Sequence, residues 1–291
     1  MMWNSQFSEE NSLWKCDNLC VPIEKLQSVP FLYSHPLAFY QYYLILLSLE
    51  ETCSFVFSED NEIKRARKLL IRLAALSGIY KNKIQWQKSM QKTNLAEIYL
   101  SSLSNDLSKE KLRSINMAFL LCTDLKLIPS TLVVKTLAST DSDLYTSLCG
   151  GICALLGPNQ CLQPKRIEVM LNSLGKQDPK IFLQERLRAG QNIWGFVSKK
   201  DEAESFNIRK RTMCLIDIAR QMNPKNEKLK QILTFIKILE EETSMSPNLD
   251  LGLSALCFCL NLTTNDVIQI FTISRIAAWT AHYIEKKSGK N

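Results

Sequence analysis

Side chains that could do acid–base chemistry are few in this sequence. It contains only two histidines, His35 and His282, among 291 residues. His35 precedes a proline near the beginning of the chain, and His282 follows Trp279 in the last apolar segment. Because nothing in the sequence brings these two imidazoles together, it does not predict a histidine acid–base pair.

Two charged residues stand out by their neighbours. Asp250 follows Pro247 and Asn248 and precedes an apolar helical run, where aspartate is a favoured helix cap. Capping and a carboxylate that faces a ligand are therefore both open interpretations. Arg275 lies within "IFTISRIAAW", and a charge among apolar neighbours needs a partner. The partner is either an acidic side chain in a buried salt bridge, for example across a dimer, or the carboxylate of a bound ligand.

The stretch "ALLGPNQCLQPKR", residues 154–166, has the form of an active-site loop. An apolar helix must end at Gly157-Pro158, because proline restricts the preceding residue and cannot donate to the turn above. The loop that follows holds neither a histidine nor an acid.

The charge balance is mildly basic, with a net charge of +7. The densest basic run, "KRARKLLIR" at residues 64–72, keeps its apolar residues on one helical stripe and its charges mostly elsewhere. A solvated helix face explains this pattern. A DNA- or RNA-binding role would rest on the charge excess alone, so no nucleic-acid partner is predicted.

The cysteines and the apolar stretches of the sequence indicate the cellular compartment of the protein. The ten cysteines form no CxxC pair and no Cys/His cluster with zinc-ligand spacing, so no metal site is predicted. The first residues lack the basic and apolar regions of a signal peptide. The longest apolar stretch, "FYQYYLILLSL", is too short to span a membrane. We therefore expect a cytoplasmic protein with no membrane partner.

Helical patterns follow one another along most of the chain. Glycine and proline number nine each, too few for a chain rich in β-turns. No alternating strand segment of convincing length is present, so the sequence predicts an all-α protein. The best-marked helical segments, by caps and periodicity, are 58–78, 107–122, 139–157, 177–190 and 263–287.

Four segments, taken in order, resemble the citrate synthase family. They are "LCTDLKLIPSTLVVKTLASTDSDLYTSLCGGICALLGP", "NIWGF", "SPNLDLGLSAL" and "FTISRIAAWTAHYIEK". The third resembles the Pro-Asn-Val-Asp segment that carries the family's catalytic aspartate, and the fourth resembles its arginine-bearing C-terminal helix. The resemblance extends from about residue 107 to residue 287.

The resemblance implies an all-α homodimer with two domains in each subunit. A large helical domain would comprise residues 1–163 and 245–291, and a small helical domain, residues 164–244, would be inserted before the C-terminal helices. The site would lie in the cleft between them. In the family, an aspartate removes a proton from acetyl-CoA, and histidines stabilise the enol and polarise the carbonyl of oxaloacetate.

Carried over position by position, the resemblance implies that the chemistry is mostly lost. The enol-stabilising histidine falls on Gln160, and the carbonyl-polarising histidine and the following arginine fall on Ser198 and Lys199. The substrate-binding histidine and a nearby asparagine fall on Leu125 and Ile128. Only the catalytic aspartate, at Asp250, and a carboxylate-binding arginine, at Arg275, keep their residue types.

Two functions are compatible with these residues. The first is a pseudoenzyme that does not condense acetyl-CoA with oxaloacetate and acts by binding, either a ligand in the old cleft or a protein partner such as an active relative. The second is an acyl-CoA-using transferase with altered substrates, in which Asp250 is the base and Gln160 the enol-stabilising donor. Ser198 would then be a further catalytic residue, Arg275 would bind substrate and Lys199 would contact the CoA. No cofactor is expected besides CoA or an acyl-CoA as ligand.

Overall fold

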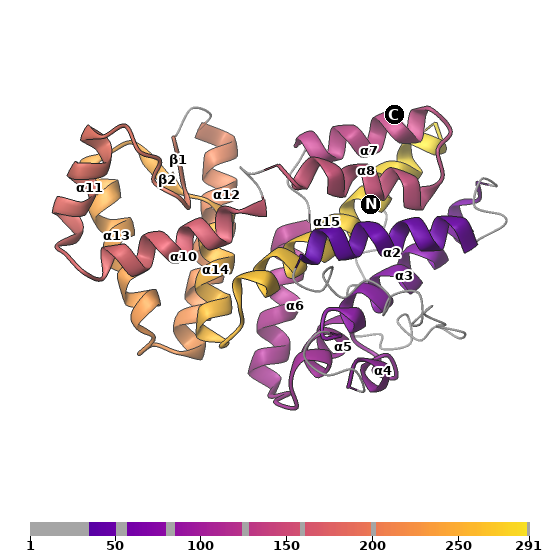
Figure 1. Cartoon of the computed structure of the whole chain (residues 1–291), viewed down its shortest axis with the longest axis horizontal. Coiled ribbons are helices and arrows are strands. Elements are labelled where there is room, and N and C mark those ends of the chain that lie inside the picture. Colours follow the sequence, from indigo (N-terminus) through magenta and orange to yellow (C-terminus); the bar gives the residue numbers. More distant parts are fainter. Residues whose placement is uncertain are drawn as a thin grey trace. The chain divides into compact units, whose positions relative to one another are not determined.

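The fold was analysed in a computed structural model, which describes residues 35–50, 57–79, 85–123, 128–157, 161–198 and 202–289. Helices account for nearly all of its regular structure, and the described residues form a single two-stranded sheet (Figure 1). The expected all-α class is confirmed. No helix in these ranges is both long enough and apolar enough to cross a membrane.

Packing divides the chain into two compact units. One, here called the large unit, comprises Met1–Gly157 with Gln269–Asn291; the other, the inserted unit, comprises Pro158–Ile268. The domain bounds expected from the sequence ended the small domain at residue 244, whereas here the next helix and the start of the last helix pack with the inserted unit. The expected bounds remain a prediction, because packing within one chain does not show which segments move together.

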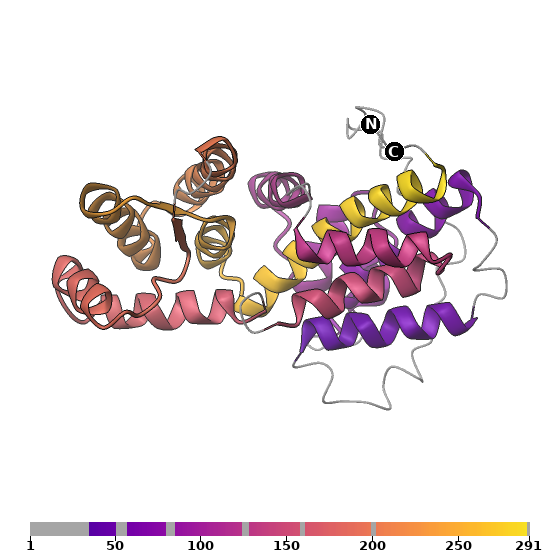
Figure 2. The ribbon, with the colours of Figure 1, turned by 90° about the horizontal axis from the view of Figure 1, so that it is seen from above.

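The large unit is helical throughout its described residues. Its elements are α2 (Pro36–Glu50), α3 (Glu59–Leu76), α4 (Gln85–Ser89), α5 (Leu95–Leu103), α6 (Lys109–Thr123), α7 (Pro129–Ser139), α8 (Leu144–Leu155) and, from Gln269 onward, α15 (Thr264–Lys287). The carboxylate of Asp143 caps α8 by accepting from the backbone N–H groups of Tyr145 and Thr146. Helix α8 lies between α2 and α7 (Figure 2).

A glycine allows α8 to approach its neighbours closely. A Cβ atom on Gly151 would lie 2.7 Å from a methyl group of Val134 on α7 and 3.0 Å from the ring of Trp279 on α15. Both neighbours are fully buried. The glycine therefore permits α15 to lie against the α7–α8 hairpin, where its long apolar run is removed from water.

The inserted unit is built around one buried helix. Its elements are α10 (Gln163–Leu174), α11 (Pro179–Arg188), β1 (Phe196–Ser198), α12 (Glu202–Met222), α13 (Glu227–Glu242), β2 (Met245–Pro247) and α14 (Leu249–Cys259). Helix α14 is buried from Leu251 to its last residue, Cys259. A Cβ atom on Gly252 would lie 2.9 Å from the carbonyl oxygen of Thr212, so α12 packs directly on its backbone.

The two short strands connect distant parts of the inserted unit. They run antiparallel, with Phe196 opposite Pro247 and Ser198 opposite Met245. The ring of Phe196 contacts that of Phe235 on α13 edge-on, at 5.7 Å between centroids. The sequence did not predict these strands, because three residues are too few for a visible alternation of apolar and polar side chains.

Candidate functional site

Asp250 lies in the first turn of α14, but it is not the residue that caps the helix. The cap is Asn248, whose side-chain oxygen accepts from the backbone N–H of Leu251 at 3.1 Å. The capping interpretation of Asp250 is therefore wrong. Because Asp250 does not cap the helix, its carboxylate remains available to face a ligand.

The surroundings of Asp250 make it an unusually basic carboxylate. Although its side chain is partly accessible, burial by neighbouring protein atoms raises the pKa of Asp250 from 3.8 to about 6. Its carboxylate makes no hydrogen bond or ion pair with any residue in the described part of the chain. A desolvated carboxylate with a pKa near 6 can accept a proton at neutral pH and release it again.

The backbone of the "NIWGF" stretch is held against the start of α14. Asn248 donates its backbone N–H to the carbonyl oxygen of Gly195 at 2.9 Å. Gly195 has a φ of +88°, and a Cβ atom there would lie 3.0 Å from a methyl group of Leu251. A glycine is thus required where this stretch meets the helix that carries Asp250. The sequence signal was the resemblance of both segments to the family, although neither Gly195 nor Asn248 was predicted to position the site.

The register of the strands carries Ser198 away from Asp250. Phe196 is opposite Pro247, near the start of α14, whereas Ser198 is two residues further from that end. At about 3.3 Å per strand residue, this is a displacement of roughly 7 Å. Ser198 is exposed at the end of β1. The two predicted catalytic residues therefore share a unit but are not brought side by side by the sheet.

Arg275 is fully buried in the large unit, in the middle of α15. One Nη atom donates to the carbonyl oxygen of Thr123 at 2.5 Å, and the other donates to the hydroxyl of Thr131 at 2.7 Å. Thr123 is the last residue of α6, where backbone carbonyls carry partial negative charge, and Thr131 lies in the first turn of α7. Its guanidinium also lies 6.0 Å from the ring of Trp279. Arg275 thus ties together the two helices that flank residues 124–127, a role that the sequence did not predict.

Several predicted positions lie outside the described residues: Gln160, Lys199 and Leu125. Of their neighbours, Ile128 is the residue immediately before α7, and Leu162 is 44 % exposed immediately before α10. The apolar side chain of Leu162 therefore faces solvent in this chain.

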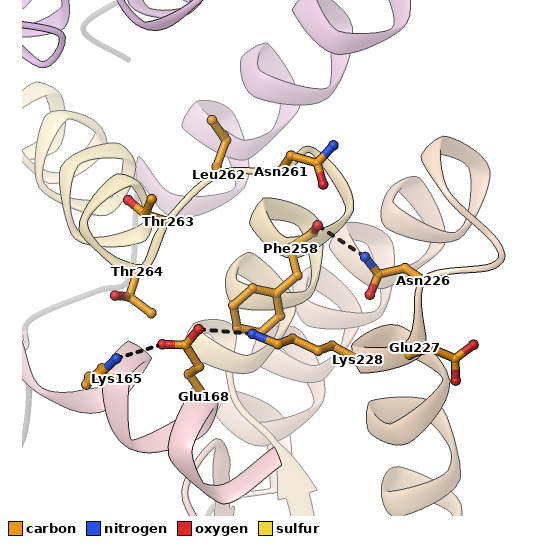
Figure 3. A pocket seen from close by; sticks show the side chains of 10 residues that line it. All are labelled: Lys165, Glu168, Asn226, Glu227, Lys228, Phe258, Asn261, Leu262, Thr263 and Thr264. Atoms are coloured by element: carbon orange, nitrogen blue, oxygen red, sulfur yellow. Dashed lines mark hydrogen bonds and ion pairs between the residues drawn. The ribbon is translucent and has the colours of Figure 1, made fainter. Parts of the chain in front are cut away.

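A pocket of about 650 Å³ lies at the other end of α14 from Asp250 (Figure 3). It is lined by Lys165, Glu168, Asn226, Glu227, Lys228, Phe258, Asn261, Leu262, Thr263 and Thr264. Glu168 accepts from Lys165 at 3.0 Å and from Lys228 at 2.9 Å. Burial raises the pKa of Glu168, but the hydrogen bonds from Lys228 and Lys165 outweigh it and hold the pKa below its usual value. A carboxylate stabilised in this way is a poor base, and none of the residues predicted for the site lines this pocket.

The chain is similar to known proteins in both sequence and fold. Residues 15–291 match the family profile described as "Citrate synthase, C-terminal domain". Citrate synthase 2 of Bacillus subtilis (strain 168) is 22 % identical over 273 residues, which cover 91 % of this chain and 72 % of that protein. For 2-methylcitrate synthase 1 of Corynebacterium glutamicum, the identity is 26 % over 186 residues, covering 62 % of this chain and 47 % of that protein.

Solved structures share the fold at low sequence identity. Citrate synthase from Thermotoga maritima MSB8 has a TM-score of 0.74 at 20 % identity, covering 94 % of this chain and 74 % of that one. Citryl-CoA lyase from Hydrogenobacter thermophilus has a TM-score of 0.53 at 19 % identity, covering 62 % of this chain and 71 % of that one. The profile match extends over almost all of the sequence, from residue 15 to residue 291, and the chain therefore belongs to the citrate synthase family.

Proposed function

We propose that this chain binds a ligand near Asp250 and does not condense acetyl-CoA with oxaloacetate. The observation that carries the proposal is the distribution of histidines: the two in the sequence are His35, which is exposed, and His282, which lies 3.1 Å from Glu285 on the same helix. Neither falls at the position of an acid–base histidine of the family, where the resemblance places Gln160 and Ser198 instead. Losing one acid–base group costs on the order of 10²–10⁴-fold in rate, so losing two removes most of an enzyme's advantage.

The test measures binding and turnover on the same protein. Thermal unfolding is followed with acetyl-CoA, propionyl-CoA, free CoA, oxaloacetate, 2-oxoglutarate and citrate, since a ligand at 100 times its dissociation constant adds roughly 2.7 kcal/mol of stability. We expect a shift with at least one CoA compound and no release of free thiol from acetyl-CoA plus oxaloacetate. Steady thiol release that is lost in Asp250→Asn would contradict the proposal, and a complete lack of thermal shifts would redirect it to a protein partner.

A second candidate function is favoured by the environment of Asp250. A carboxylate with a pKa of about 6 and no partner among the described residues is suited to removing a proton from the α-carbon of an acyl-CoA. The C–H electron pair would move into the thioester carbonyl to give an enolate, the Gln160 amide would donate a hydrogen bond to the enolate oxygen, and Asp250 would hold the proton until it is returned.

This second candidate has a direct assay that needs no acceptor substrate. In D₂O, reversible proton removal replaces the methyl protons of acetyl-CoA by deuterium, which proton NMR detects as a loss of the methyl signal. We expect exchange in the wild type and none in Asp250→Asn, with Asp217→Asn on the exposed surface of α12 as the control. Equal exchange in Asp250→Asn and the wild type would exclude Asp250 as the base.

Assembly and location complete the proposal. We infer a homodimer, as the resemblance implies, with hetero-association with an active relative as the alternative; sedimentation equilibrium of the protein alone and of a mixture distinguishes them. A cytoplasmic location is supported by the placement of cysteines within apolar helices, such as the buried Cys259 of α14, where oxidation would disturb the packing.

A further inference from the structure

An arginine and a tryptophan stack on each other at the start of α10. The guanidinium carbon of Arg166 lies 4.3 Å from the ring of Trp194. Arg166 is in the first turns of α10, and Trp194 directly precedes the glycine that meets α14. Both residues are partly exposed, so the pair lies at the protein surface, although Nη1 of Arg166 is itself covered.

Two buried polar atoms beside this stack lack partners. Nη1 of Arg166 and Oε1 of Gln163 are both removed from solvent, and neither has a hydrogen-bond partner among the residues described. The two residues are three positions apart on α10 and therefore face the same side of the helix. Leaving a buried donor or acceptor unsatisfied costs about 1–3 kcal/mol each, so two such atoms on one side of a helix call for an explanation.

Some other arginines of the described residues pair with carboxylates. Arg209 donates twice to the carboxylate of Glu240, and Arg65 pairs with Glu62 at 2.6 Å. Arg186 is the nearest match to Arg166, because it also lies over an aromatic ring, that of Phe182, at 5.0 Å. Arg186, however, donates to the carbonyl oxygen of Asn192 at 2.9 Å. Arg166 has neither an acidic partner nor a carbonyl within the described chain.

We propose that Arg166, Gln163 and Trp194 form a binding site for a small oxyanion, the carboxylate or phosphate group of a ligand. The indole ring fixes the plane of the guanidinium, so its in-plane N–H groups are oriented to donate to two oxygens at once. Gln163 accepts from a hydroxyl or P–OH group adjacent to the anionic oxygens. The site does not depend on the function proposed for Asp250, because an oxyanion is bound here without any proton transfer.

The first measurement uses inorganic phosphate, acetate and glycolate as probes of the full chain. Each is titrated at a constant ionic strength of about 0.15 M while tryptophan fluorescence is recorded, so that general screening does not change. We expect saturable changes in fluorescence that are absent from Trp194→Phe. Glycolate, which has a hydroxyl next to its carboxylate, should bind more tightly than acetate, and Gln163→Ala should remove that difference.

The decisive variant is Arg166→Gln, with Arg186→Gln as its matched control. Arg166→Gln should weaken binding of all three anions by at least about tenfold, because a charge-assisted pair is lost. Arg186→Gln, which removes a stacked arginine of the same unit, should bind like the wild type. Equal affinities in Arg166→Gln and the wild type, or no saturable change with any probe, would overturn the proposal.

A variant that unfolds would not leave the question open. If Arg166→Gln melts far below the wild type, Arg166→Lys replaces it, since the charge stays while the planar fork is lost. Wild-type affinity in Arg166→Lys together with wild-type affinity in Gln163→Ala would also count against the site. The acetyl-CoA exchange assay is independent of both outcomes, because these probes contain no thioester.

Discussion

Asp250 and Arg275 are the two positions at which the resemblance predicts that the family's residue types are kept, and their surroundings differ. Asp250 has no partner among the described residues, and its pKa is raised to about 6 by burial. Arg275 is held at the ends of α6 and α7 by a carbonyl and a hydroxyl. A functional interpretation therefore suits Asp250, whereas the recorded contacts of Arg275 give it a structural role, and its predicted role in substrate binding stays a prediction.

The raised pKa of Asp250 predicts a pH-dependent effect on stability. Because the folded-state pKa, about 6, lies above the ordinary value of 3.8, the folded chain binds this proton more tightly than the unfolded chain. Its contribution to stability is fully present below pH 3.8 and is lost as the pH rises through 6. Asp250→Asn should therefore raise the free energy of unfolding by about 1–3 kcal/mol at pH 8 and by little at pH 4.

Urea unfolding of the two proteins at both pH values measures this difference. Asp217→Asn on an exposed position serves as the control and should show no such dependence. A loss of stability in Asp250→Asn at pH 8 would mean that the ionised carboxylate is favourably bound in the folded chain.

The contacts of Arg275 predict a structural cost when they are removed. Arg275→Met should lower the free energy of unfolding by about 2–4 kcal/mol, because the carbonyl of Thr123 and the hydroxyl of Thr131 lose their donor in a buried place. Arg275→Lys keeps one donor and should cost less. Chemical denaturation compares them, and a neutral Arg275→Met would show that the two hydrogen bonds do not stabilise the chain.

Among the elements, β1 and the start of α14 depend on one glycine. Gly195 has a positive φ and leaves 3.0 Å between its would-be Cβ and Leu251, whereas Gly190 has a φ of +62° with nothing within 4 Å. Comparing alanine substitutions at these two glycines separates the cost of backbone strain from the cost of crowding by a neighbouring side chain. Both glycines lie in the inserted unit, so both substitutions affect the stability of the same unit.

Gly195→Ala should therefore destabilise the chain more than Gly190→Ala. We expect about 2 kcal/mol or more for Gly195→Ala, from strain plus contact with Leu251, and about 1 kcal/mol for Gly190→Ala, from strain alone. Thermal or urea unfolding provides the values. Equal costs would mean that Leu251 moves aside freely and that the stretch before β1 is not held by packing.

The elements also show how far the sequence could predict the fold. Helix α11 begins and ends as expected, because Asp178 before a proline and Gly190 after the last turn are local signals. Strands β1 and β2 were missed, since their pairing is a tertiary contact between short segments. Asp250 was identified from the family motif, but the sequence did not show that Asn248, and not Asp250, caps the helix. The stack of Arg166 on Trp194 was not predicted either, because it joins two segments that no local sequence pattern connects.

For the whole molecule, the order of the segments along the chain determines which unit can fold independently. The inserted unit is one continuous stretch, Pro158–Ile268, whereas the large unit needs residues from both sides of it. The inserted unit also has its own buried helix, α14, and its own aromatic cluster. A fragment of residues 158–268 should therefore fold alone.

Circular dichroism and urea unfolding of that fragment check this prediction. We expect helical signal and a single cooperative transition. The complementary fragment, residues 1–157, lacks Arg275 and Trp279 and should not unfold cooperatively. A fragment 158–268 without a transition would show that the inserted unit depends on the rest of the chain.

The position of α15 after the inserted unit has a consequence for biosynthesis. As the chain leaves the ribosome, the inserted unit can complete its packing before Arg275 and Trp279 emerge, because all of its residues precede Gln269. Helices α2 to α8 must wait, with the surfaces that α15 will cover still exposed, until the whole inserted unit and the residues after Gln269 have been synthesised. Of the two units, the nascent large unit is thus exposed to chaperones and to premature association for the longer time.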